Sequence, residues 1–136
     1  RVLVETLANL DKIERLPQEH AASTYAPMLT REHEQINWGQ DRSTVVNLIH
    51  GLNPWPGAYT THNGKILKVL RAERLSHTSS VPPGTVVDVD KNHGFTVQTG
   101  EGQALITQVQ PQGGKKMDAS AYARGYGLAV GDKLGE

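Results

Sequence analysis

The sequence predicts a mainly β domain, a small barrel or sandwich with short helices packed beside it. From Tyr59 onward, apolar and polar residues recur at the short spacing of strands, with turn residues about every 8 to 12 positions. Before that point, Val45, Leu48, Ile49 and Leu52 have the spacing of a single helix face. A helix that leads into several short strands is therefore the expected architecture.

Length and composition agree with one domain of ordinary size. The chain has 136 residues, of which 37% are hydrophobic, so it has enough apolar side chains for a single core. The absence of cysteine excludes disulfides and thiolate metal sites. No apolar run reaches the length of a membrane span, and no signal-peptide pattern opens the chain. Because the sequence begins at Arg1 and enters a helical pattern at once, we expect it to be part of a longer protein.

The net charge of zero combines two unlike halves. Residues 1–41 hold four basic and seven acidic side chains, a net charge of −3, and residues 42–136 hold ten basic and seven acidic ones, a net charge of +3. A basic second half permits a surface that binds a polyanion. A mixed, solvated surface agrees with these charges equally well.

The first forty residues predict a helix and an extended linker. Residues 2–16 form the expected helix, with one apolar stripe made by Leu3, Leu7, Leu10 and Ile13. We expect this stripe to be frayed or to be covered by a second copy of the chain, because an amphipathic helix needs a partner. Residues 17–40 lack periodicity and predict a linker. Four apolar side chains are placed to hold it along the domain: Tyr25, Leu29, Ile36 and Trp38.

The next helix leads into a proline-rich junction. Asp41 or Ser43 is the expected N-cap, and the helix is expected to end near Gly51 or Leu52. The stretch from Asn53 to Tyr59 follows, in which two prolines flank a tryptophan and fix the backbone on either side of it. A large aromatic side chain on so stiff a backbone predicts that Trp55 fills the core at the helix-to-sheet junction.

The strands are predicted from their turns. Asn63-Gly64 is the strongest short hairpin signal and separates residues 59–62 from residues 66–75. Further turns at 92–94 and 100–102 separate the expected strands over 85–90, 95–99 and 104–110. A short helix is expected near 118–124, and Lys133-Leu134 is expected to close an edge of the sheet.

Catalytic and metal-binding patterns are missing from the sequence. The six histidines are scattered over different elements, and Asn37 stands where a two-histidine zinc helix would need its second ligand after His33-Glu34. The chain has neither a Gly-x-Ser-x-Gly elbow nor a phosphate-binding Gly-x-x-x-x-Gly-Lys-Ser/Thr loop. We therefore predict no catalytic, cofactor-binding or metal-binding residue in this chain.

The remaining candidates are cations. Lys65, Lys68, Arg71 and Arg74 lie on one predicted strand, and strict alternation would put Arg71 on the face opposite Lys68 unless a bulge turned it round. A second group follows the last long strand and consists of Lys115, Lys116 and Arg124. These side chains are suited to phosphate contact, and they are equally suited to protecting the edge of a sheet.

Several segments together resemble the linker and C-terminal domain of the methionyl-tRNA formyltransferase family. The resemblance lies in residues 24–30, 36–38, 52–59, 105–111, 114–117 and 130–134, in the order and spacing of that family. It implies three parts: 1–16 as the terminal helix of a preceding catalytic domain, 17–40 as linker, and 41–136 as a C-terminal barrel similar to an OB fold. It also implies a cytoplasmic protein, or one of an organellar matrix if the source is not bacterial.

The resemblance implies a role for the cations. The family transfers a formyl group from 10-formyltetrahydrofolate to methionyl-initiator tRNA, and its catalytic residues belong to the preceding domain, so this chain alone should be inactive. Lys115 and Lys116 match a basic pair of the family, Lys68 and Arg71 match less closely, and Arg31 stands where relatives often have lysine. The tRNA contacts that we predict are Arg31, Arg42, Lys65, Lys68, Arg71, Lys115, Lys116 and Arg124.

Two other functions remain open at this point. The chain is also compatible with the C-terminal domain of a related formyltransferase that acts on a nucleotide sugar or on folate. A purely structural or oligomerising barrel is the third possibility, and its association with nucleic acid would scarcely respond to salt. Binding to tRNA in a gel-shift assay would distinguish the tRNA-binding function from these two.

Overall fold

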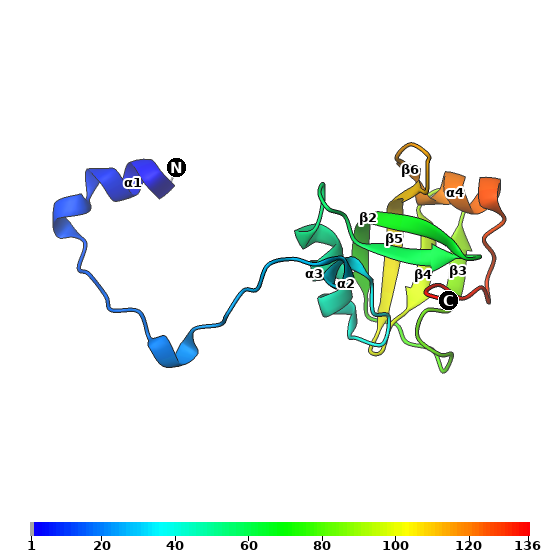
Figure 1. Cartoon of the computed structure of the whole chain (residues 1–136), viewed down its shortest axis with the longest axis horizontal. Coiled ribbons are helices and arrows are strands. Elements are labelled where there is room, and N and C mark those ends of the chain that lie inside the picture. Colours follow the sequence, from blue (N-terminus) through cyan, green and yellow to red (C-terminus); the bar gives the residue numbers. More distant parts are fainter. Residues whose placement is uncertain (1) are drawn as a thin grey trace.

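The computed structural model describes residues 2–136 and shows a six-stranded antiparallel sheet with short helices (Figure 1). The mainly β prediction is confirmed. The α-helices are α1 (Val2–Ala8), α2 (Arg31–Glu34), α3 (Arg42–Gly51) and α4 (Ala119–Tyr126). The strands are β1 (Tyr59–His62), β2 (Lys65–Leu75), β3 (Val86–Asp90), β4 (Gly94–Gln98), β5 (Gln103–Pro111) and β6 (Met117–Asp118).

The predicted turns connect neighbouring strands. His62 pairs with Lys65 across Asn63-Gly64, and both turn residues have positive φ, as a two-residue hairpin turn requires. The turns at 92–94 and 100–102 likewise join β3 to β4 and β4 to β5. The sheet order is β1-β2-β5-β4-β3, with β6 paired to β5, so β1 and β3 form the two ends.

The C-terminal tail spans the gap between those ends. Among the pairings of residues 2–136 no ladder joins β3 to β1, so strand pairing does not close the sheet. Instead Leu134 N–H donates to Gly84 O (2.9 Å) beside β3, and Gly135 N–H donates to Thr61 O (3.0 Å) in β1. An isolated bridge between Thr85 and Lys133 belongs to the same contact, as expected for an edge-closing tail. Strand pairing therefore leaves the sheet open and the tail links its two ends, so the OB-like barrel expected from the resemblance stays a prediction.

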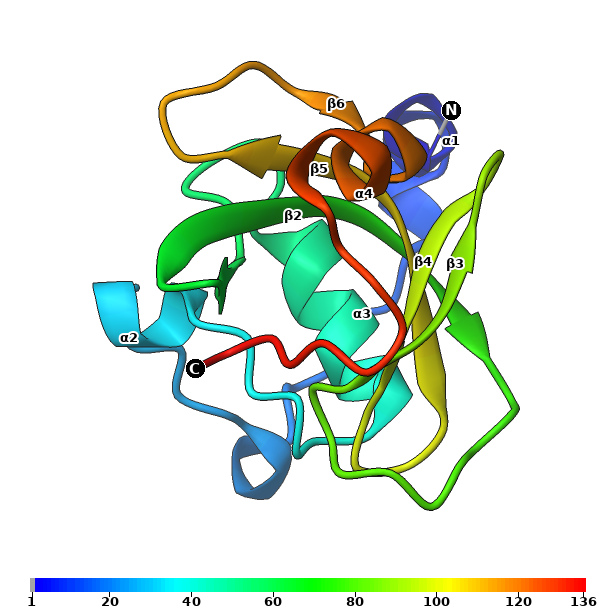
Figure 2. The same cartoon turned by 90° about the vertical axis from the view of Figure 1, so that its right-hand side faces the viewer.

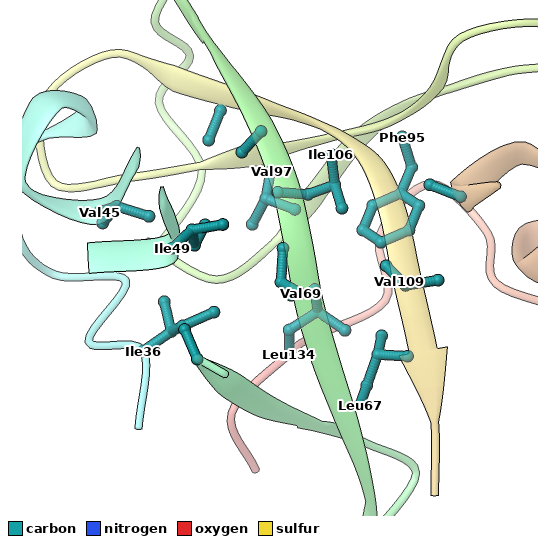
Figure 3. Close-up of a cluster of buried hydrophobic side chains, with 14 of the residues drawn as sticks. Ile36, Val45, Ile49, Leu67, Val69, Phe95, Val97, Ile106, Val109 and Leu134 are labelled. Carbon is teal, nitrogen blue, oxygen red and sulfur yellow. The ribbon is translucent and has the colours of Figure 1, made fainter. Parts of the chain in front are cut away.

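The core lies inside the curled sheet, between α3 and α4. Figures 1 and 2 show these helices at opposite ends of the sheet, and Figure 3 shows side chains from α3, β2, β4, β5 and the tail meeting between them. Ile49, Leu67, Phe95, Ile106 and Val109 are fully buried. Each such side chain stabilises the fold by about 1.5–3 kcal/mol through its removal from water.

The last residues before α3 pack on the sheet. Ile36 N–H donates to Tyr59 O (2.8 Å), and the Trp38 indole N–H donates to Thr60 Oγ1 (3.0 Å). Both Ile36 and Trp38 are buried, whereas Tyr25 and Leu29 are exposed. Of the four apolar side chains expected to hold the linker, the two nearest α3 do so.

Two expectations about the apolar residues are wrong. The first helix ends at Ala8 and is followed by a single 3-10 turn (Leu10–Lys12), so it is shorter than residues 2–16, and the apolar stripe is exposed. Residue 1 lies outside the described residues. Trp55 does not fill the core, since 84% of its surface is exposed. The buried tryptophan is Trp38.

None of the helices in residues 2–136 combines the length and apolar character that crossing a membrane requires.

Asp41 is the N-cap of α3, as predicted. Its carboxylate accepts hydrogen bonds from the backbone N–H groups of Ser43 and Thr44 and from the Thr44 hydroxyl. The Thr44 hydroxyl and then the Thr44 N–H are the main causes that lower the pKa of Asp41 below 3.8. The charged carboxylate is therefore the form that stabilises the helix start.

Replacing Asp41 by Asn is expected to keep part of the cap and to change the response to acid. A lowered pKa in the folded state means that the stabilisation is fully present above the unfolded pKa, near 3.8, and is lost as the pH falls through the lower folded value. Urea unfolding should show D41N less stable than the parent chain near pH 7, with the gap shrinking as the pH is lowered below about 4. A gap that is constant with pH would contradict this assignment.

Candidate nucleic-acid interface

A row of side chains crosses three strands on the outside of the sheet. Tyr59 in β1 pairs with Lys68 in β2, and Lys68 pairs with Gln110 in β5. The Arg31 guanidinium of α2 lies over the Tyr59 ring, 5.3 Å from its centroid, in a cation–π contact. At the other end, Gln110 Nε2 donates to Gly114 O (3.0 Å). The row therefore runs from α2 to the turn between β5 and β6.

Two predicted site residues share one groove along this row. A groove of about 300 Å³ is lined by Arg31, Ile66, Lys68 and residues 110–113. Lys115 and Lys116 follow directly in the same turn, and both are exposed. Lys65 begins β2 and lines a neighbouring groove with Pro111 and Gln112. The fold thus gathers cations from α2, the start of β2 and the β5–β6 turn.

A bulge adds Arg71 to the same face. Lys68, Val69 and Arg71 pair in succession with Gln110, Val109 and Gln108, so Leu70 is the extra residue. Because Gln110 and Gln108 are two apart in β5, Lys68 and Arg71 lie on one side of the sheet. Arg71 is exposed and lines a groove of about 420 Å³ with His50 and Asn53. The sequence alone did not decide on which face of the sheet Arg71 lies.

The other cations lie elsewhere or are engaged. Arg42 begins α3 and packs against Gly102 in the β4–β5 turn, beside Leu75 at the far end of β2. Arg74 Nη2 donates to Asn47 Oδ1 on α3. Arg124 is exposed in the last turn of α4. The geometry therefore separates Arg42 from the predicted cluster.

The clustered cations are available to bind anions. None of Arg31, Lys65, Lys68, Arg71, Lys115 and Lys116 makes one of the ion pairs found within residues 2–136. Lys68 is held by a hydrogen bond from Nζ to Pro56 O (2.8 Å), a neutral acceptor that leaves the positive charge uncompensated. An anion in this region would thus meet fixed positive charge without displacing a carboxylate.

Sequence reasoning missed the residues that hold this cluster together. Tyr59 fixes Arg31, and Gln110 ties β5 to the basic turn, but neither is charged and neither belongs to a recognised motif. The signal that was available for Tyr59 is its position in a hairpin with a defined register, which puts it opposite Lys68. Arg31 itself comes from a separate element, so its meeting with Tyr59 depends on the three-dimensional fold.

A buried polar cluster borders the groove that Lys65 lines with Pro111 and Gln112. The His62 Nδ1 and the Tyr122 hydroxyl are 2.8 Å apart, and His62 Nε2 lies 3.5 Å from Asp132 Oδ2. Burial raises the pKa of Tyr122 to about 12, so its hydroxyl stays protonated at neutral pH. These contacts tie β1, α4 and the tail together. Within residues 2–136 no three His, Asp or Glu side chains gather as a metal site would require.

Known proteins similar to this chain are formyltransferases. The chain matches the family described as "Formyl transferase, C-terminal domain" over residues 28–127. It is 47% identical to the methionyl-tRNA formyltransferase of Moorella thermoacetica, with 98% of this chain aligned to 43% of that protein. It is 40% identical to the corresponding protein of Bacillus velezensis, with 100% of this chain aligned to 44% of that protein. The chain therefore spans less than half the length of these relatives.

Similar folds occur among solved structures. The crystal structure of HypX from Aquifex aeolicus in complex with tetrahydrofolic acid matches with a TM-score of 0.63. That match covers 94% of this chain and 23% of HypX, at 19% sequence identity, so it speaks for the fold alone. With the family match over 28–127 and the relatives at 40% identity or more, the chain belongs to the family of formyl transferase C-terminal domains.

Proposed function

We propose that this chain is the tRNA-binding C-terminal part of a methionyl-tRNA formyltransferase. The observation that carries the proposal is a group of cations without carboxylate partners, in which Arg31, Lys68 and Arg71 lie on one side of the sheet and Lys115 and Lys116 in the adjoining turn. Lys65 lines a neighbouring groove. Phosphate oxygens are the natural ligands of such a surface, and contacts of this kind position an RNA without reading its sequence. The 47% identity to a methionyl-tRNA formyltransferase supports tRNA as the RNA in question.

The whole enzyme would join this region to a catalytic domain. The formyl donor, 10-formyltetrahydrofolate, and the methionyl-tRNA amino group would react there, because the face described above offers cations and amides but no nucleophile or poised general base. The exposed stripe of α1 would then pack against that domain. We place the protein in the cytoplasm, where a translation enzyme of bacterial relatives acts. The nucleotide-sugar and structural alternatives have no specific observation in their favour.

Binding of tRNA should depend steeply on salt, and Lys115 and Lys116 should account for part of that dependence. Each phosphate contact contributes about 0.7–0.9 to the slope of log affinity against log salt. Replacing both lysines by Ala is expected to reduce the slope by about 1.4–1.8. Gel shifts or fluorescence anisotropy over a salt series would measure this. An unchanged slope would remove the pair from the interface.

The chain by itself is expected not to transfer formyl groups. A formylation assay with charged initiator tRNA and 10-formyltetrahydrofolate would test this, with a complete relative as the positive control. Formylation by the purified 136-residue chain would contradict the proposed division of labour. Absence of any salt-sensitive tRNA binding would contradict the proposed function as a whole.

A further inference from the structure

Trp55 is the most exposed aromatic side chain on the sheet domain. It is 84% exposed, whereas Trp38, the other tryptophan, is 5% exposed and hydrogen-bonded to Thr60. A large exposed indole is costly in water, and the core offers it no partner here. The packing of this domain therefore does not explain why a tryptophan stands at this position in the α3–β1 junction.

The backbone around Trp55 is held in place. Pro54 and Pro56 flank it and fix φ on both sides, so the ring is presented from a stiff segment. The carbonyl of Pro56 accepts a hydrogen bond from Lys68 Nζ (2.8 Å), which ties the segment to β2. Little conformational freedom remains to be lost when a ligand contacts the ring, which favours binding.

A cation lies near each end of this segment. Lys68 contacts it at Pro56, and Asn53, two residues before Trp55, lines one groove together with Arg71. Lys68 and Arg71 lie on the same side of β2 because of the bulge at Leu70. An exposed aromatic ring on a segment that cations border suits a ligand that has a flat aromatic surface and negative charge in the same repeating unit. A nucleotide of single-stranded RNA has both.

We infer that Trp55 is a stacking platform for an unpaired nucleobase, with Lys68 and Arg71 binding the phosphates beside that base. The inference rests on the proposed function and extends it, because the phosphate contacts alone would serve duplex and single strand equally. It assigns to this domain a contact with an unstacked nucleotide of the bound tRNA. An apolar protein surface would contact the same indole without using the two cations.

The chain's own fluorescence provides the test. Because Trp38 is buried, quenching that accompanies RNA binding is expected to come from Trp55. A short unstructured adenine-rich oligoribonucleotide should quench the emission, and inorganic polyphosphate, which has no bases, should bind without quenching. Replacing Trp55 by Ala is expected to weaken oligoribonucleotide binding about 5- to 150-fold and to abolish the quenching, while W55F keeps most of the affinity.

Matched variants separate stacking from other causes. W55A should melt near the parent chain, because the side chain is exposed, and V130A, also at an exposed apolar position, should leave RNA binding unchanged. Salt-sensitive tRNA binding with no quenching and full affinity in W55A would overturn the stacking inference and leave the proposed function intact. Loss of self-association in W55A with normal RNA binding would also overturn it, in favour of a protein contact. Failure of the parent chain to bind any RNA would instead overturn the proposed function.

Discussion

Replacing Arg31, Lys68, Lys115 and Lys116 together by Gln is expected to lower the affinity for tRNA roughly a thousandfold at about 0.1 M salt. The reason is that the four cations come from three elements and meet on one face, around one groove and the turn that follows it. Each lost phosphate contact removes its share of counterion release, so the slope of log affinity against log salt should fall by about 3. Anisotropy titrations of labelled tRNA over a salt series would give both quantities.

Charge-matched controls decide whether position or net charge matters. Four other cations lie away from the groove. Lys12 and Arg15 precede α2, Lys91 lies in the β3–β4 turn, and Lys133 lies in the tail. Replacing these four by Gln changes the net charge by the same amount and is expected to leave most of the affinity. Equal losses in the two variants would mean that tRNA responds only to net charge, and the groove would lose its assigned role.

Arg42 provides a sharper comparison within the predicted site. The sequence places it among the tRNA contacts, but the structure puts it beside Gly102, at the far end of β2 from Lys68. We expect R42Q to change the salt slope by much less than K68Q does. If R42Q lowered the slope of log affinity against log salt as much as K68Q does, the interface would have to extend along the whole length of β2.

The sequence was sufficient wherever a local rule decided the structure. Asn63-Gly64 fixed a hairpin because two successive residues with positive φ favour one turn type, and that hairpin set the pairing of Tyr59 with Lys68. Asp41 was identifiable as an N-cap because its carboxylate needs only the next three residues as partners. Both features follow from neighbours in the chain.

The sequence was insufficient wherever the partner lay far along the chain. An amphipathic stripe predicted a helix over 2–16, but no apolar surface within 2–136 covers it, and a short isolated helix is marginal in water. Trp55 was expected in the core and Trp38 was expected to hold the linker along the domain, but only Trp38 is buried, with the Thr60 hydroxyl as its partner. The side taken by Arg71 depended on a bulge whose position is set by pairing with β5.

Replacing Gly94 by Ala is expected to destabilise the domain more than any exposed substitution. Gly94 begins β4 with φ at +131°, a conformation that side chains rarely adopt, and an added Cβ would lie 2.0 Å from the carbonyl oxygen of Ile106. The Cβ would also lie 3.0 Å from that of Ala119 in α4. The obstacle is backbone of β5, which cannot move away without breaking the β4–β5 ladder beside Phe95. Backbone strain and overpacking together should cost about 2–5 kcal/mol.

Gly64 is the matched control, because it separates the two causes. It also has positive φ, at +71°, but an added Cβ would meet nothing within 4 Å. G64A should therefore show the conformational cost alone, about 1–2 kcal/mol. Urea unfolding followed by circular dichroism would compare the two variants. Because a domain of this size is stable by only about 5–15 kcal/mol, G94A should unfold at much lower urea than G64A. Equal urea midpoints for the two variants would mean that β4 and β5 separate easily at Gly94. The sheet face that carries Lys68 and Gln110 would then be less firmly supported than the β4–β5 pairing implies.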